Sequence, residues 1–369
     1  MKLRKAVPAV IFLAASVVLL LLSDPRRVAS QEGETARAVV VEADDSEVQR
    51  HGLIEFGTQH LKVRMPDGST AAANNELRAQ LELDKKFAPG DVTLVVRGRE
   101  PLVARDHWRL GWGLALFAAF AVLLCAFGGW TGAKALFSFV LSCLAVWKIL
   151  VPGCLDGWNA AWTSFAVVSI LTAAIMYLVA GWTRKGLVAF LGAMLGVAAS
   201  LGLADFFAAA MHVNGATMPF VQSLLYSGYP DLDLADVFVG ATILASSGAV
   251  MDLAMDIAAG QAEVARHNPG LSRRELFLSG LRIGRSVVGT MTTTLLLAYS
   301  GGYLTLLMVF AAQGTHPFDF LNSTLVSAEL VKTLVGSFGL VLVAPFTALV
   351  GAALTPERRI ANPSGRNMV

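Results

Sequence analysis

Two aspartates in an otherwise apolar segment are the residues of this sequence best suited to chemistry. They lie in the run GATILASSGAVMDLAMDIAAGQAE, where Gly248, Asp252, Asp256 and Gly260 recur every four residues. This spacing places all four on one face of a helix. Two carboxylates one turn apart at low dielectric repel each other, so one of them holds a proton near neutral pH unless a cation compensates it. The pattern therefore predicts a site that handles protons or cations.

A structural interpretation of the same aspartates stays open beside the functional one. Arg282 and Arg285 follow across a short loop on the predicted cytoplasmic side, where they could pair with Asp252 and Asp256. Such ion pairs hold helices together without any transport. The two interpretations are compatible, and the sequence does not choose between them.

Glycines and hydroxyl groups gather in the next apolar run, GRSVVGTMTTTLLLAYSGG at residues 284–302. Small residues and hydroxyls are typical of helix-packing faces, whereas glycine-loosened helices also line substrate sites in transporters. Because a short loop joins this run to the aspartate helix, we expect the two helices to be neighbours. The predicted polar wall opposite the aspartates consists of Ser286, Thr290, Thr293 and Thr294, and the predicted helix-packing positions are Gly248, Gly260, Gly284 and Gly289.

Other polar residues in apolar runs give weaker signals. Asp205 is a reserve candidate for the polar pathway because no partner lies near it in the sequence. Glu329 and Lys332 are three residues apart and are predicted to neutralise each other as a structural pair. Tyr299 with the following glycine pair, 301–302, marks a predicted kink.

The composition places all these residues in a polytopic membrane protein. Of the 369 residues, 55% are hydrophobic and 15% are charged, and the mean hydropathy is +0.60. A spanning helix needs about 20 apolar residues, and eight runs qualify: 6–22, 110–128, 135–151, 161–181, 187–211, 235–258, 286–312 and 325–354. The net charge of +2 gives no indication of nucleic-acid binding. The three cysteines have no ligand-like spacing, so neither a metal site, a disulfide framework nor a cofactor is predicted.

The distribution of Lys and Arg predicts the orientation. The predicted outside loops 152–160, 212–234 and 313–324 contain no Lys or Arg, whereas the other loops between spans contain several. Both termini are therefore predicted in the cytoplasm, and residues 24–108 outside it. The first run also fits a signal peptide cut after Ser30, but its length favours an uncleaved signal anchor.

The predicted outside segment differs from the rest of the chain. The alternating runs ARAVVVEA, HLKVRM and DVTLVVRG, separated by the turn signals MPDGS and APGD, predict short half-buried strands. About 85 residues can bury a modest core. An OB-like or SH3-like barrel fits this length, and the periodicity leaves both open. The segment would serve as a structural or recruiting module.

The blocks GAVMDLAMDIAAGQAEV and RRELFLSGLRIGRSVVGTMTTTLLLAYSGGYL resemble the YibE/F-like family of bacterial multi-span membrane proteins. The resemblance extends over residues 110–350 and is most specific between 248 and 304. This chain differs from the family pattern at Ser286, where the family usually has an acidic residue, and at Thr293, where the family usually has an asparagine. The resemblance implies a helix bundle in the inner membrane whose architecture is similar to that of permeases.

These observations predict a mainly α-helical bundle with a small N-terminal β-rich domain. The expected divisions are a signal anchor at 1–23, the β domain at 24–108, a seven-helix membrane domain at 109–355 and a cytoplasmic tail at 356–369. We expect a secondary transporter for an unknown substrate, coupled to a proton or cation, with the bilayer as its partner. A homo-oligomer is compatible with the sequence. The alternative is a non-transport scaffold or assembly factor that recruits a partner through the β domain. An enzyme is not expected, because no HExxH, GxSxG or GxGD pattern occurs. No Walker A motif occurs either, so coupling to ATP would need a partner.

Overall fold

A computed structural model describes residues 34–355 except 82 and 99. The described chain divides into two compact units, one containing all the strands and extending to Gly129, and the other beginning at Trp130. The predicted signal anchor with its first span, 6–22, and the predicted cytoplasmic tail lie outside the described residues.

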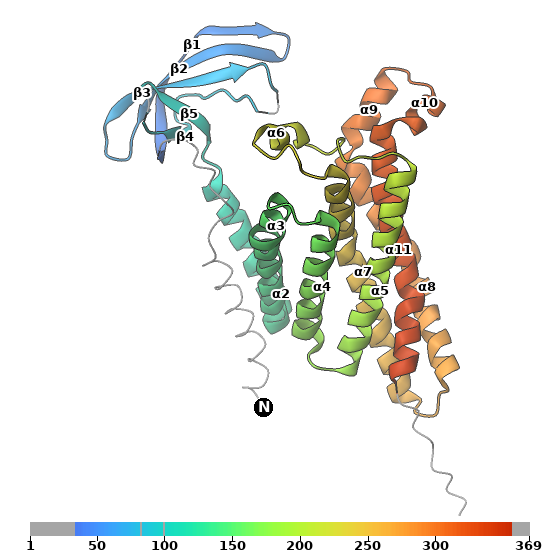
Figure 1. Cartoon of the computed structure of the whole chain (residues 1–369). Coiled ribbons are helices and arrows are strands. Elements are labelled where there is room, and N and C mark those ends of the chain that lie inside the picture. The colour runs from blue at the N-terminus through green and yellow to red at the C-terminus, as the bar shows by residue number, and fades with distance from the viewer. Residues whose placement is uncertain (1–33, 82, 99, 356–369) are drawn as a thin grey trace, which may run out of the picture. The chain divides into compact units, whose positions relative to one another are not determined.

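The N-terminal unit contains a closed five-stranded barrel, which confirms the predicted β-rich domain. Its strands are β1 (Thr35–His51), β2 (Ile54–Arg64), β3 (Thr70–Arg78), β4 (Val92–Val96) and β5 (Leu102–His107). They close in the order β1-β2-β3-β5-β4, with β4 paired back to β1 (Figure 1). All the pairs are antiparallel except β3 with β5, which run parallel.

Alternation along the strands builds the barrel core. Val40, Leu61, Val63 and Val95 point inward and are buried, while their neighbours along each strand face outward. Successive side chains of a strand point to opposite faces of the sheet. The runs in which apolar and polar residues alternate therefore place their apolar side chains in the barrel core. The predicted turn between β2 and β3 is closed by a hydrogen bond from the amide of Gly68, which has a φ of 85°, to the carbonyl of Met65 at 3.0 Å.

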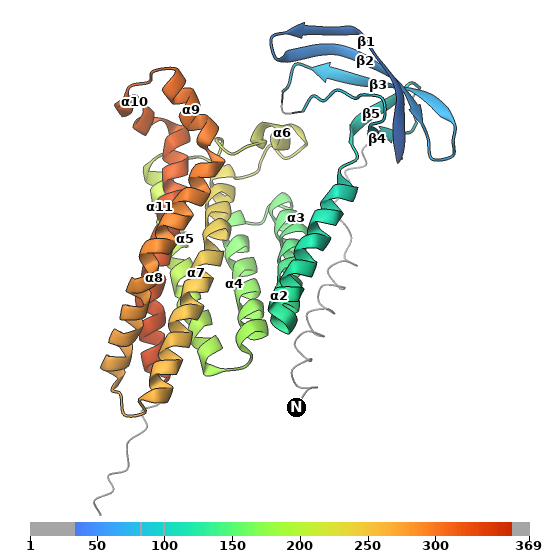
Figure 2. The ribbon, with the colours of Figure 1, turned by 180° about the vertical axis from the view of Figure 1, so that it is seen from behind.

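The remaining regular elements of the described chain are helices (Figures 1 and 2). They are α2 (Leu110–Ala145), the π-helical η1 (Val146–Leu150), α3 (Val151–Leu155), α4 (Ala160–Ala180), α5 (Arg184–Ala210), α6 (Val221–Tyr226), α7 (Leu234–His267), α8 (Arg273–Gly302), α9 (Leu304–Ala312), α10 (Pro317–Asn322) and α11 (Thr324–Leu354).

Five of the described helical segments are long and apolar enough to cross a membrane, or six if α8 and α9 together form one span. The predicted count of eight is therefore not confirmed. The predicted spans 110–128 and 135–151 fall within one stretch, Leu110–Leu155, of 46 residues. A straight helix of that length would measure about 70 Å, more than twice the hydrocarbon thickness of a bilayer. The stretch is not straight, because Gly129 interrupts α2 with non-helical angles (φ 52°, ψ −129°).

Close approach of small residues holds the bundle together. α11 packs against α5, α7 and α8, and α5 also packs against α7. A Cβ on Gly196 of α5 would lie 3.0 Å from Val250 of α7 and 3.0 Å from Val343 of α11. Since lipid tails are as apolar as leucine, close packing of this kind contributes directly to helix association in a membrane.

Local signals in the sequence set the ends of the helices around the candidate site. The side chain of Asp233 accepts hydrogen bonds from the amides of Ala235 and Asp236 and so caps the start of α7. Ser272 and Glu275 form a capping box at the start of α8. α8 ends after the glycine pair 301–302, and α9 continues at an angle of 64° to it. The kink predicted near Tyr299 is confirmed, and Tyr303 is the non-helical residue between the two helices.

Candidate functional site

Asp252 and Asp256 lie on the outward side of α7. Both side chains are exposed, and neither makes a hydrogen bond or ion pair with any part of the chain that the structure describes. Their carboxylates are close enough to interact electrostatically with each other. The pairing with Arg282 and Arg285 that the structural interpretation requires is therefore not formed among the described residues.

The opposite side of α7 explains this orientation. Its large apolar residues Ile243, Val250, Leu253 and Ile257 are buried against neighbouring helices, and Val250 contacts both α5 and α11. Packing of this face turns the aspartates away from the bundle interior. Residues four apart are separated by 400° around a helix, so a stripe with this spacing drifts by about 40° at each step. Gly248 is consequently exposed with the aspartates, whereas Gly260 has rotated into the contact with α8. The predicted single face is correct for three of the four residues.

The hydroxyl groups of α8 are also exposed, and they are satisfied within their own helix. Ser286 and Thr290 donate to the carbonyls of Ile283 and Val287, three residues back, at 2.7 and 2.9 Å. Thr293 and Thr294 donate to carbonyls four residues back at 3.1 and 3.0 Å. Such bonds to the preceding turn leave the hydroxyl oxygen free to accept a further bond.

α7 and α8 are neighbours, as predicted, and run side by side (Figure 2). A Cβ on Gly260 of α7 would lie 2.7 Å from Ile283 of α8, and a Cβ on Gly284 of α8 would lie 3.3 Å from Ile257 of α7. Measured from the contact between Ile257 and Gly284, Asp252 lies five residues away along α7 and Thr290 lies six residues away along α8. These intervals correspond to about 8 Å and about 9 Å along the two helix axes. The aspartates and hydroxyls therefore share a level of the bundle.

This arrangement differs from the predicted wall facing the aspartates. The acidic and hydroxyl residues lie side by side on the outward faces of adjacent helices and are not enclosed between them. Gly284 and Gly260 both lie in the close contact between the two helices. A Cβ on Gly248 or on Gly289 would meet no other atom within 4 Å, so the described chain supplies no packing partner for either glycine.

Asp205 lies elsewhere. It is exposed near the end of α5 and interacts electrostatically with Asp236, in the first turn of α7. The side chain of Asn159 donates a hydrogen bond to Asp236 in turn. Asp252 is 16 residues further along α7, about 24 Å away along its axis. The structure therefore does not bring Asp205 together with the two central aspartates.

A second polar group lies in the bundle and extends the predicted pair of Glu329 and Lys332 to residues that the sequence did not connect with it. Glu329, Lys332, Thr333 and Gly336 follow one another at i, i+3, i+4 and i+7 on α11, and Tyr299 of α8 lies against them. Lys332 and Glu329 form an ion pair of 2.8 Å, which agrees with the predicted pair. The hydroxyls of Tyr299 and of Thr333, which is 4% exposed, are buried without a hydrogen-bond partner. The helical spacing of polar residues in α11 was the signal that could have revealed this group.

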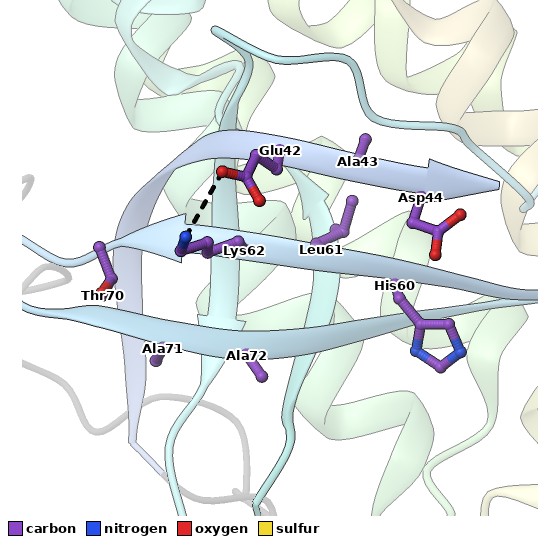
Figure 3. Close-up of a pocket in the computed structure, with 9 residues that line it drawn as sticks. All are labelled: Glu42, Ala43, Asp44, His60, Leu61, Lys62, Thr70, Ala71 and Ala72. Carbon is purple, nitrogen blue, oxygen red and sulfur yellow. Dashed lines mark hydrogen bonds and ion pairs between the residues drawn. The ribbon is translucent and has the colours of Figure 1, made fainter.

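The barrel carries a groove on its outer face (Figure 3). It measures about 680 Å³ and is lined by residues of β1, β2 and β3, among them the ion pair of Glu42 and Lys62 at 3.4 Å. His60 also lies in this wall. Its ring contacts the side chains of Asn74 at 3.0 Å and Glu47 at 3.2 Å, and these hydrogen bonds raise the pKa of His60 above its ordinary value.

No group of three or more His, Cys, Asp or Glu side chains suited to a metal ion occurs among the described residues. A family model described as YibE/F-like protein matches residues 116–357, about two thirds of the chain. The matched range contains both the aspartate stripe of α7 and the hydroxyl run of α8. No curated protein and no solved structure matches the chain.

Proposed function

This chain belongs to the YibE/F-like family, and we propose that it is a secondary transporter driven by protons or another small cation. Asp252 and Asp256 are the cation-handling pair in this proposal. The hydroxyls of Ser286, Thr290 and Thr294 on α8 form the polar surface beside them. The observation that carries the proposal is the exposure of two carboxylates without partners among the described residues, halfway along an apolar helix.

The depth of the pair supports this role. α7 has 34 residues, and Asp252 lies 18 residues after its start and 15 before its end. These intervals correspond to about 27 Å and 22 Å, so Asp252 is near the middle of α7 and inside the apolar run 235–258. A bare carboxylate at that depth costs about 3 kcal/mol or more. Two adjacent carboxylates reach a low-energy state when they share one proton or hold one cation. Loading and release of that ion provide a coupling step.

The break between α8 and α9 is a second support. Interrupted helices expose backbone groups and are common at the substrate sites of transporters. The break at Tyr303 is one turn from Tyr299, whose hydroxyl is buried beside α11. A change of the bend angle would therefore move the interior polar group as well as the hydroxyl face of α8. We propose that the chain lies in the bacterial inner membrane with both termini in the cytoplasm and the barrel outside it.

Proton flux into vesicles tests the proposal. The full chain is reconstituted into liposomes that contain a pH-sensitive dye, and a potassium diffusion potential is imposed with valinomycin. We expect the wild type to acidify the vesicle interior faster than empty liposomes, and Asp252→Asn and Asp256→Asn to abolish the difference. Asp319→Asn, in the exposed helix α10, is the matched control and retains the flux. Sodium flux, which would indicate that the coupling ion is sodium, is measured in the same way with a sodium-sensitive dye inside the vesicles.

A scaffold that recruits a partner through its barrel is the second candidate. Two observations favour it: the close contacts at Gly260 and Gly284, which leave no room between α7 and α8 at that level, and the groove on the barrel. Equal proton and sodium flux in wild type, Asp252→Asn and empty vesicles would reject ion passage by the aspartate pair in the absence of substrate and favour the scaffold.

A further inference from the structure

A surface cavity of about 450 Å³ lies where α4 ends and α5 begins. The last two turns of α4 and the first two turns of α5 form its wall. Most of this wall is apolar and consists of Ala173, Met176, Leu187 and Phe190. The size falls in the range of sites that hold small organic molecules.

Aromatic side chains mark the level at which the cavity opens. Trp182 lies in the short connection between the two helices and is 91% exposed. Its ring centroid is 5.1 Å from that of Tyr177 on α4, and both residues line the cavity. Trp and Tyr gather at the boundary between hydrocarbon and water, where one edge is apolar and the other wet. α4 and α5 each qualify as a span, so their connection lies at this boundary.

The rim of the cavity is positively charged without a compensating acid. Arg184 lines the cavity and Lys185 follows it, and neither forms an ion pair with any described residue. The sequence contains no Asp or Glu between Asp156 and Asp205. The start of α5, a helix of 27 residues, adds the positive end of its dipole at the same place. The rim is therefore complementary to an anionic group, and the wall to a hydrocarbon chain.

We propose that this cavity binds one anionic phospholipid. An acyl chain lies against the apolar wall formed by α4 and α5, and Arg184 and Lys185 bind the phosphate. A basic site directly at the end of a span favours an anionic headgroup over a zwitterionic one. A free phosphate ion would use only the rim and leave the apolar wall exposed. The site is separate from the aspartate pair, and the proposal does not depend on transport.

Lipid retention of the purified full chain tests the proposal. The protein in mild detergent is mixed with equal amounts of phosphatidylglycerol and phosphatidylethanolamine, and bound lipid is measured by native mass spectrometry. We expect phosphatidylglycerol to dominate in the wild type. In the double variant Arg184→Gln/Lys185→Gln the preference falls by about fivefold for each lost charge. The double variant Arg282→Gln/Arg285→Gln loses the same charge at an exposed position on α8 and retains the preference.

A second variant tests the apolar wall without altering charge. Ala173→Phe fills the cavity and reduces retention of both lipids. Ala166→Phe, seven residues earlier on the exposed side of α4 and outside the cavity lining, does not. Thermal unfolding of each variant confirms that it is folded. Three results would overturn the proposal: an unchanged preference in Arg184→Gln/Lys185→Gln, an equal loss in Arg282→Gln/Arg285→Gln, or displacement of the lipid by inorganic phosphate alone.

Discussion

The side-chain nitrogen of Gln261 on α7 donates a hydrogen bond of 3.0 Å to the backbone carbonyl of Ala348 on α11. The same nitrogen donates a second bond of 3.0 Å to the carbonyl of Leu276 on α8. Gln261 is 2% exposed, and a Cβ at Gly280 or Gly351 would collide with it. One amide thus joins three helices at a point where two glycines make room for it.

We expect Gln261→Ala to weaken the bundle. It removes two hydrogen bonds worth about 1 kcal/mol each, and it leaves a cavity where the amide was. The midpoint of thermal unfolding in detergent, followed by circular dichroism, should fall by several degrees. Gln222→Ala, at an exposed position of α6, is the control and leaves the midpoint unchanged. Equal midpoints for the two variants would show that the amide does not hold the three helices together.

Glycines of α8 should differ in their tolerance of a methyl group. A Cβ on Gly284 would lie 2.8 Å from the Cβ of Ala344, which has no rotamer to move into, so Gly284→Ala is expected to cost about 1–3 kcal/mol. Gly289 has open space around it, and Gly289→Ala is expected to gain up to about 1 kcal/mol from the higher helix propensity of alanine. Thermal unfolding of the two variants gives the sign of each change. A loss at Gly289 as large as that at Gly284 would mean that another protein surface covers Gly289.

The buried hydroxyl of Tyr299 has no partner among the described residues. An unsatisfied buried hydroxyl costs about 1–3 kcal/mol, so Tyr299→Phe is expected to leave the bundle as stable as the wild type or more so. Tyr303→Phe is the comparison, because the hydroxyl of Tyr303 contacts that of Ser300 at 3.3 Å. Chemical unfolding of both variants is the measurement. A clear destabilisation by Tyr299→Phe would indicate that a bound water or solute satisfies the hydroxyl.

In the barrel, the side chain of Gln59 holds the segment between β3 and β4 in place through hydrogen bonds. Its side-chain nitrogen donates to Asp45 and to the carbonyl of Phe87, both at 2.8 Å, and its oxygen accepts from the amide of Phe87 at 3.0 Å. Gln59→Leu leaves the backbone groups of Phe87 unpaired, which is expected to cost about 2–5 kcal/mol. Amide hydrogen exchange at residues 85–88 should accelerate strongly. Gln49→Leu, exposed on β1, should leave that exchange unaltered.

His60 should titrate above its ordinary value. Hydrogen bonds with Asn74 and Glu47 favour the protonated ring and raise its pKa in the folded barrel. Their contribution to stability is therefore fully present below the unfolded pKa of about 6.5, and it is lost as the pH rises through the higher folded pKa. NMR titration of histidine-labelled protein, assigned with His60→Gln, measures the value. Asn74→Ala should move it back towards the ordinary value, and an unchanged titration would show that the hydrogen bond with Asn74 is not the cause of the raised pKa.

Much of the architecture followed from the sequence alone, because it depends on patterns of local origin. The period of two in ARAVVVEA and its companion runs predicted a half-buried sheet, and a closed barrel was found. Long apolar runs predicted the helices, and the glycine pair after Tyr299 predicted the bend. The short loop between the aspartate and hydroxyl runs predicted that α7 and α8 are neighbours. The family followed from the block around Asp252 and Asp256.

Tertiary packing decided which way each stripe faces. The close packing of α7 against its neighbouring helices buries Leu253 and Ile257 and so turns Asp252 outward, a result that the spacing of the aspartates does not contain. Packing also placed Tyr299 of α8 against Gly336 on a polar side of α11, and it joined Gln261 to Ala348 across 87 positions. The sequence by itself determined the elements and the residues that are costly in lipid. Only the fold decided which of them meet, because contacts between distant segments depend on the shapes of all the helices at once.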